Sequence, residues 1–118
     1  MSASARRTGY TSKMLAKCVV DVLNGKAVLV VAHTGHYAED LKAQFMRAFA
    51  AYLVMLTVNG NRVSVMESGG EARFIGLERA SLRGVYRTRP NVYVDNSIYC
   101  LPVYPATRMF EIWTELPQ

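Results

Sequence analysis

The apolar positions in the first half of the chain predict two helices separated by a buried strand. Between Ser12 and Leu23 apolar residues recur three and four positions apart, the spacing of one helix face, and Asn24-Gly25 ends the pattern. The six residues Ala27–Ala32 are apolar without alternation, which is typical of a strand covered on both faces in a parallel sheet. A second helical pattern follows over 37–56, with Thr34 as its N-cap.

The middle of the chain predicts at least one β-hairpin. The end of the second helix stays open, because 53–58 also fits a strand that would turn at Asn59-Gly60. We prefer the next hairpin, which joins Arg62–Met66 to Ala72–Gly76 through the turn Ser68-Gly69-Gly70. Both of its segments alternate between apolar and polar residues, as a half-buried hairpin does.

The last third predicts a short buried strand and a weaker element. Asn91–Asp95 follows a proline and reads as a buried strand that ends on an acid. The segment Met109–Leu116 alternates weakly, and we favour an edge strand over a short helix, since Pro102 and Pro105 interrupt any helix before it. The pattern as a whole predicts an α/β fold: one domain, residues 1–118, with a small, mainly parallel sheet, flanking helices and an inserted hairpin.

Composition narrows the class of protein. With 118 residues, 51% hydrophobic and 19% charged, the chain is too apolar to be intrinsically disordered. Its longest apolar run, Ala27–Ala32, is far shorter than the roughly 20 residues of a membrane span. No apolar stretch follows the basic residues near the N-terminus, so we expect no secretory signal, no membrane partner and a cytoplasmic location, in the host cytoplasm for a viral protein. Cys18 and Cys100 are expected to be buried free thiols.

The charge balance is basic, and arginine supplies most of it. Lysine and arginine number 14 against 9 acids, and ten of the fourteen are arginine, whose planar fork matches phosphate. Four arginines lie within eleven residues: Arg79, Arg83, Arg87 and Arg89. They are candidates to clamp nucleic-acid phosphates at the carboxyl edge of the sheet. The alternative is a loop of solvated arginines.

Tyrosines interleave with this basic region and are candidates for stacking on bases: Tyr86, Tyr93, Tyr99 and Tyr104. For Tyr93, which lies inside the expected strand, core packing is the stronger explanation.

The order of these segments resembles the ATPase core of P-loop helicases and phage large terminases. The matching stretches are Leu29–Thr34 leading into Tyr37–Phe45, the Gly-Gly hairpin, Ser81–Gly84 and Val92–Asp95. Upstream, Arg7–Ser12 takes the place of the phosphate-binding loop. The resemblance covers residues 8–96 and implies a reduced P-loop NTPase-like domain, as in small phage-encoded proteins.

The sequence departs from that family at the chemical centre. In a working loop, G-x-x-x-x-G-K-[ST], a lysine reaches the phosphates and a hydroxyl holds magnesium. Here Gly9 is the second glycine, Tyr10 replaces the lysine and Thr11 keeps the hydroxyl. Asp95 keeps the Walker B acid, but Asn96 replaces the glutamate that positions water. We expect no efficient ATP hydrolysis, which favours a protein that is not an enzyme.

The resemblance still implies candidate binding residues. Gly9, Thr11 and Asp95 are the residual nucleotide-binding set, with Asp95 holding magnesium through water or, alternatively, capping the next turn. No cofactor is firmly expected beyond a weakly held magnesium–nucleotide.

The loop of His33, Thr34 and His36 matches the helicase loop that touches the nucleic-acid backbone; alternatively it is a polar turn that caps a helix.

Two function classes follow from these observations. The first is a nucleic-acid-associated accessory protein on a degenerate P-loop NTPase scaffold. The alternative is a protein-interaction module, for example a phage protein that binds a host factor, with no nucleotide role. A third reading is a residual nucleotide-binding enzyme that borrows a cationic residue from a partner subunit. Salt-dependent oligonucleotide binding separates the first two.

Overall fold

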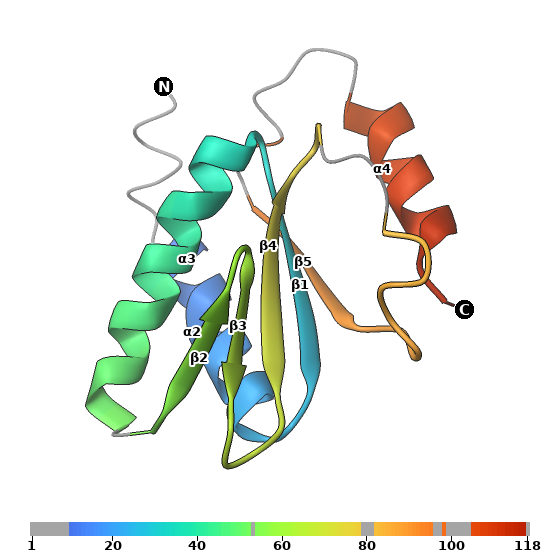
Figure 1. Cartoon of the computed structure of the whole chain (residues 1–118). Coiled ribbons are helices and arrows are strands. Elements are labelled where there is room, and N and C mark those ends of the chain that lie inside the picture. Colours follow the sequence, from blue (N-terminus) through green and yellow to red (C-terminus); the bar gives the residue numbers. More distant parts are fainter. Residues whose placement is uncertain (1–9, 53, 79–81, 96–97, 99–104, 118) are drawn as a thin grey trace.

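The computed structural model describes residues 10–52, 54–78, 82–95, 98 and 105–117. Within them the chain forms three α-helices, one short 3-10 helix and five strands (Figure 1). The helices are α2 (Tyr10–Leu23), α3 (Gly35–Phe49), η1 (Ala50–Tyr52) and α4 (Pro105–Glu115). The strands are β1 (Ala27–Ala32), β2 (Leu56–Asn59), β3 (Arg62–Val65), β4 (Glu71–Gly76) and β5 (Asn91–Val94).

The five strands form one mixed sheet in the order β2-β3-β4-β1-β5. The central strand β1 pairs in parallel with β4 on one side and with β5 on the other. Strands β2 and β3 extend the sheet beyond β4 through antiparallel pairs. This arrangement confirms the predicted α/β class, with a parallel centre, flanking helices and an inserted hairpin.

Helices cover both faces of the sheet, and β1 contributes to two separate cores. Val28, Val30 and Ala32 pack with α2 and α3 on one face. Leu29 and Val31, which point to the opposite face, pack with Ile112 of α4 and with Leu116, which directly follows that helix. Because β1 is buried on both faces, its unbroken apolar run is explained.

The hairpin region is a three-stranded meander. The predicted pairing of 62–66 with 72–76 is present, and the alternative turn at Asn59-Gly60 is present as well, joining β2 to β3. The helical pattern over 37–56 was too long, because α3 ends at Phe49 and Leu56 begins β2. Apolar residues spaced for a helix there also satisfy the alternation of a strand, and tertiary pairing with β3 decides between the two.

The prediction of an edge strand over Met109–Leu116 was wrong, because residues 109–115 lie in helix α4 and Leu116 directly follows it. Pro105 is the first residue of the helix, a position at which the missing N–H costs nothing. Ile112 and Leu116, four residues apart, are both buried against the sheet. The helical spacing of those two residues was the signal, and the weak alternation around them obscured it.

Two further observations bear on the sequence analysis. Within the described ranges, no helix is long and apolar enough to cross a membrane. Cys18 is a buried free thiol, as predicted, and burial together with the nearby Asp21 carboxylate raises its pKa to about 12. Cys100 lies outside the described residues.

Candidate functional site

Two of the predicted nucleotide-site residues meet, although 84 positions separate them in the chain. Thr11 lies in the first turn of α2, and Asp95 directly follows β5. The Thr11 hydroxyl donates a hydrogen bond to Asp95 Oδ1 at 3.1 Å. Asp95 is fully buried, and its backbone is fixed on both sides, since its N–H donates to the Val31 carbonyl and its carbonyl accepts from Ile98 N–H. The fold therefore brings a hydroxyl and a carboxylate together at the carboxyl edge of the parallel strands.

Tyr10 occupies the position of the lysine of a working phosphate loop. Its hydroxyl donates to the Val94 carbonyl at 2.8 Å, so the side chain reaches the end of β5 beside Asp95. A phenol at that position carries no positive charge, and this one is engaged with the backbone. Gly9 and Asn96, the other two positions in the comparison with P-loop proteins, lie outside the described residues.

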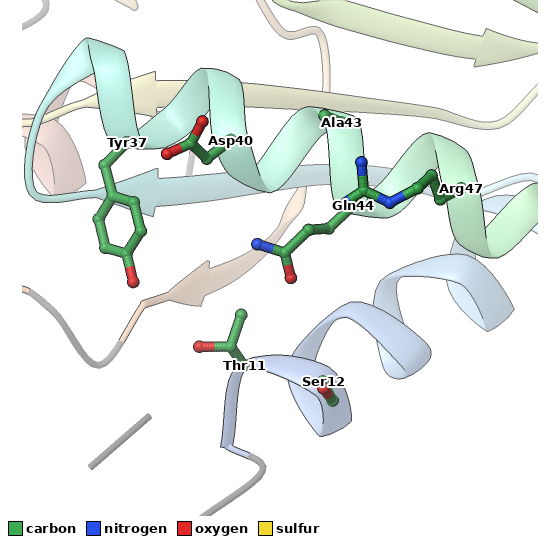
Figure 2. A pocket seen from close by; sticks show the side chains of 7 residues that line it. All are labelled: Thr11, Ser12, Tyr37, Asp40, Ala43, Gln44 and Arg47. Carbon is green, nitrogen blue, oxygen red and sulfur yellow. The ribbon is translucent and has the colours of Figure 1, made fainter. Parts of the chain in front are cut away.

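A polar hollow of about 360 Å³ opens beside Thr11, between the first turn of α2 and the outer side of α3. Figure 2 shows Tyr37 and Gln44 pointing from α3 towards Thr11, with Asp40 between them along the helix and Arg47 beyond Gln44. Sequence analysis missed these α3 residues. The available signal was the polar series at 37, 40, 44 and 47, which has the spacing of one helix stripe.

The histidine loop acts as a helix cap. Thr34 is the N-cap of α3, and its hydroxyl oxygen accepts from the Tyr37 N–H at 3.1 Å. The Gly35 N–H donates to Glu78 Oε2 at 2.7 Å. A carboxylate therefore already lies at the positive end of α3, where a phosphate would otherwise be favoured. His33 is half-buried and His36 is exposed.

Gly76 makes this junction possible, since β4 ends directly against the start of α3. A Cβ atom at Gly76 would lie 2.2 Å from the Gly35 nitrogen and 2.3 Å from the Thr34 carbonyl carbon. Only glycine permits such a close approach of two backbone segments.

The described part of the arginine-rich segment, residues 82–90, is a loop that leads into β5 beside α4 (Figure 1). Arg83, Arg87 and Arg89 are all exposed, while Arg79 lies outside the described residues. The expectation that the cluster lies at the carboxyl edge was wrong for Arg89. That residue comes two positions before Asn91, which pairs with Val28 near the start of β1. Because β5 runs parallel to β1, Arg89 lies at the opposite edge of the sheet from His33.

Tyr93 and Tyr86, two of the tyrosines that interleave with the arginines, have partners within the fold. The Tyr93 hydroxyl donates to Asp21 Oδ2 at 2.5 Å, and the Asn91 amide donates to the same oxygen at 3.0 Å. Desolvation and the contact with Asp21 raise the pKa of Tyr93. Tyr86 packs against the α4 core beside Arg73, and burial raises its pKa as well. Tyr99 and Tyr104 lie outside the described residues.

Neither a metal site among the described residues nor a similarity to a known protein adds to this geometry. Among the described residues no group of three or more histidine, cysteine, aspartate or glutamate side chains is placed to hold a metal ion. Comparison with models of protein families, with curated proteins and with solved structures finds no match to this chain.

Proposed function

We propose that this chain is a nucleic-acid-associated accessory protein built on a degenerate P-loop NTPase-like scaffold that does not hydrolyse ATP. The observation that carries the proposal is the contact between Thr11 and Asp95. The resemblance assigns the hydroxyl at the start of the first helix and the acid after the Walker B strand to one residual nucleotide-binding set. A chance similarity of segment order gives no reason for these two side chains to meet.

The chemistry of this pair fits a weakly held magnesium ion. Hydroxyl and carboxylate oxygens are magnesium ligands, and Thr11 and Asp95 are the residues that would hold the ion. When bound, it would neutralise charge on the phosphates of a nucleotide. With Tyr10 in place of the lysine, the chain supplies no cation of its own at that position, so nucleotide affinity is expected to be low.

The absence of hydrolysis is tested by an ATPase assay on the purified chain. Without the lysine, and with Asn96 at the position of the water-positioning glutamate, turnover is expected to stay at background. A rate of about 1 per second, ordinary for an enzyme, would contradict the degenerate scaffold.

The nucleic-acid part of the proposal is supported by the loop between β4 and β5. Gly84 has a φ of +80°, and the Val85 N–H donates to the Leu82 carbonyl at 3.1 Å, so residues 82–85 form a turn with Arg83 near its tip. Arg87 and Arg89 are exposed further along the same loop. These side chains offer guanidinium groups to phosphates from one continuous loop.

A salt titration of oligonucleotide binding tests this part. Each phosphate contact is expected to contribute a log–log slope of about −0.7 to −0.9. The double variant Arg83→Ala/Arg87→Ala should flatten the slope by roughly one to two units and weaken all sequences alike. Lys13→Ala/Lys17→Ala, which removes two exposed cations from α2, is the matched control. Equal slopes for the wild type and the arginine variant would exclude the loop as the phosphate contact.

A protein-interaction module is the second candidate, and the outer edge of the sheet favours it. Strand β2 is an edge strand, and Met55, Val58 and Met66 are exposed at or beside it. The Met66 N–H donates to the Met55 carbonyl at 3.4 Å, so these two methionines are neighbours. An exposed edge with apolar side chains suits a partner strand. Absence of oligonucleotide binding at low salt, with capture of a protein partner that depends on Met55, would favour this candidate.

A further inference from the structure

Helix α4 turns two large aromatic side chains towards solvent. Phe110 is 68% exposed and Trp113 is 37% exposed. They are three residues apart and therefore lie on the same side of the helix. Ile112, on the side of α4 opposite Phe110, and Leu116, directly after the helix, belong to the core against the sheet. Neither aromatic ring belongs to the core that α4 forms with the sheet.

Arg89 lies over one of these rings. Its guanidinium carbon is 4.5 Å from the centre of the Trp113 ring, and its Nη1 lies 3.5 Å from the Pro117 carbonyl oxygen. A guanidinium that stacks on an indole ring leaves its in-plane N–H groups available as donors and keeps its charge at the protein surface. Arg89 is therefore oriented by α4 before any ligand arrives.

The loop that carries Arg89 is held in place by apolar anchors. Leu82 and Pro90 are buried, and Tyr86 between them packs against the core under α4. The anchors recur every four residues, and Arg87 and Arg89 lie exposed between the last two. The positions of these cations are thus determined by the packing of their neighbours.

The acids of α4 do not offset this charge. The Glu111 carboxylate pairs with Arg108 at 3.0 Å, and Glu115 Oε1 accepts from the Leu82 N–H at 2.7 Å. Both acids thus serve contacts within the fold, whereas Arg87 and Arg89 are exposed residues.

From these contacts we infer that Phe110, Trp113, Arg87 and Arg89, here called the aromatic–arginine surface, bind single-stranded nucleic acid. Bases stack on the Phe110 ring and on the outer plane of the Arg89 guanidinium, and the arginines neutralise phosphates. This inference rests on the proposed function and specifies the class of nucleic acid.

The side chains favour a single strand over a duplex or an acidic peptide. A duplex keeps its bases stacked on each other, so an exposed phenyl ring gains nothing from contact with the backbone. An acidic peptide would satisfy the arginines but would leave Phe110 exposed. A single strand offers flat base faces and phosphates together, which matches a helix face with two aromatic rings and the Arg89 guanidinium over one of them.

The test compares binding of a labelled oligothymidine with binding of a duplex of equal length. Phe110→Ala is expected to weaken single-strand binding by about five- to a hundredfold. It should leave the salt slope unchanged, because the ring carries no charge, whereas Arg87→Ala should reduce the slope by about 0.7. Phe110→Tyr should keep most of the affinity. Val20→Ala, which removes an apolar side chain that is 53% exposed on α2 and lies outside this surface, is the matched control.

A second readout is local to the surface. Trp113 is the only tryptophan of the chain, so binding should change its fluorescence in proportion to the occupied fraction. Unchanged tryptophan fluorescence on saturation with oligothymidine would overturn the inference.

The remaining outcomes separate the inference from the proposed function. If Phe110→Ala binds oligothymidine like the wild type, while Arg83→Ala/Arg87→Ala flattens the salt slope, the inference fails and the proposed function survives. If the wild type binds neither oligonucleotide at low salt, both fail. Binding of a polyglutamate peptide in that case, lost in Phe110→Ala, would assign the surface to an acidic protein partner.

Discussion

At the scale of single residues, Asp95 is a buried carboxylate that depends on its surroundings for hydrogen bonds. A carboxylate with no exposed surface is stable only where hydrogen bonds replace the water it has lost. Thr11 supplies one such bond from the start of α2. This contact therefore contributes to stability as well as to the proposed nucleotide site.

Replacement of Thr11 by valine tests that contact. The variant keeps the shape of the side chain and removes the donor, so the free energy of unfolding should fall by about 1–2 kcal/mol. Chemical denaturation measures the change. Ser12→Ala, at the exposed neighbouring position, should stay within about 0.5 kcal/mol of the wild type. An unchanged midpoint for Thr11→Val would mean that the hydroxyl contributes nothing to holding Asp95.

Cys18 should be unreactive in the folded protein. Its pKa is raised from 9.0 to about 12, chiefly by burial, so the folded thiol keeps its proton where an unfolded one loses it. In a Cys100→Ser variant at pH 9, alkylation should be slow in the native state and fast in denaturant. The same shift predicts that stability falls as the pH rises from 9 towards 12, because only the unfolded chain releases the proton. Rapid alkylation of the native protein would contradict the buried position.

At the scale of secondary-structure elements, α4 has two sides with different roles. Its inner side completes the second core through Ile112, and its outer side presents Phe110. An edge strand over the same residues would place Phe110 and Ile112 on one face of the sheet, since side chains alternate along a strand. The helix separates them.

A pair of alanine substitutions in α4 tests this division. Ile112→Ala should reduce the free energy of unfolding by about 2–4 kcal/mol, because it removes a fully buried side chain. Phe110→Ala, two positions earlier, should change it by less than about 0.5 kcal/mol. Urea denaturation followed by circular dichroism gives both values. Similar losses for the two variants would place Phe110 in the core and remove the basis of the aromatic–arginine surface.

At the scale of the whole molecule, the two cores share a single sheet. Val30 and Val31 are adjacent in β1, yet the first packs under α2 and α3 and the second under α4. Loss of β1 therefore destroys both cores at once.

Unfolding is accordingly expected to be one cooperative transition. Trp113 reports on α4 and the second core, and far-ultraviolet circular dichroism reports on all the helices. The two signals should give coincident curves in denaturant. A tryptophan transition that precedes the circular dichroism transition would show that α4 detaches independently.

The sequence alone determined the α/β class, the boundaries of β1 and the hairpin of β3 with β4. Those features depend on short-range patterns: an unbroken apolar run and alternation around a glycine turn. It also identified Thr11 and Asp95 as candidates, through the resemblance and not through any local physical signal. Over 53–58 and 109–116 the pattern of apolar residues fits both a helix and a strand, so the sequence did not decide between them.

Only the tertiary structure decided which distant residues meet. The end of α3, the second turn at Gly60 and the helical state of α4 depend on pairing and packing with residues far along the chain. The same is true of the contact of Thr11 with Asp95, of Glu78 at the start of α3, and of Arg89 on Trp113. The arginines looked like one cluster because they are close in sequence. The chain passes from the carboxyl end of β4 to the amino end of β5 between them, and so the fold places Arg89 against α4, away from the histidine loop.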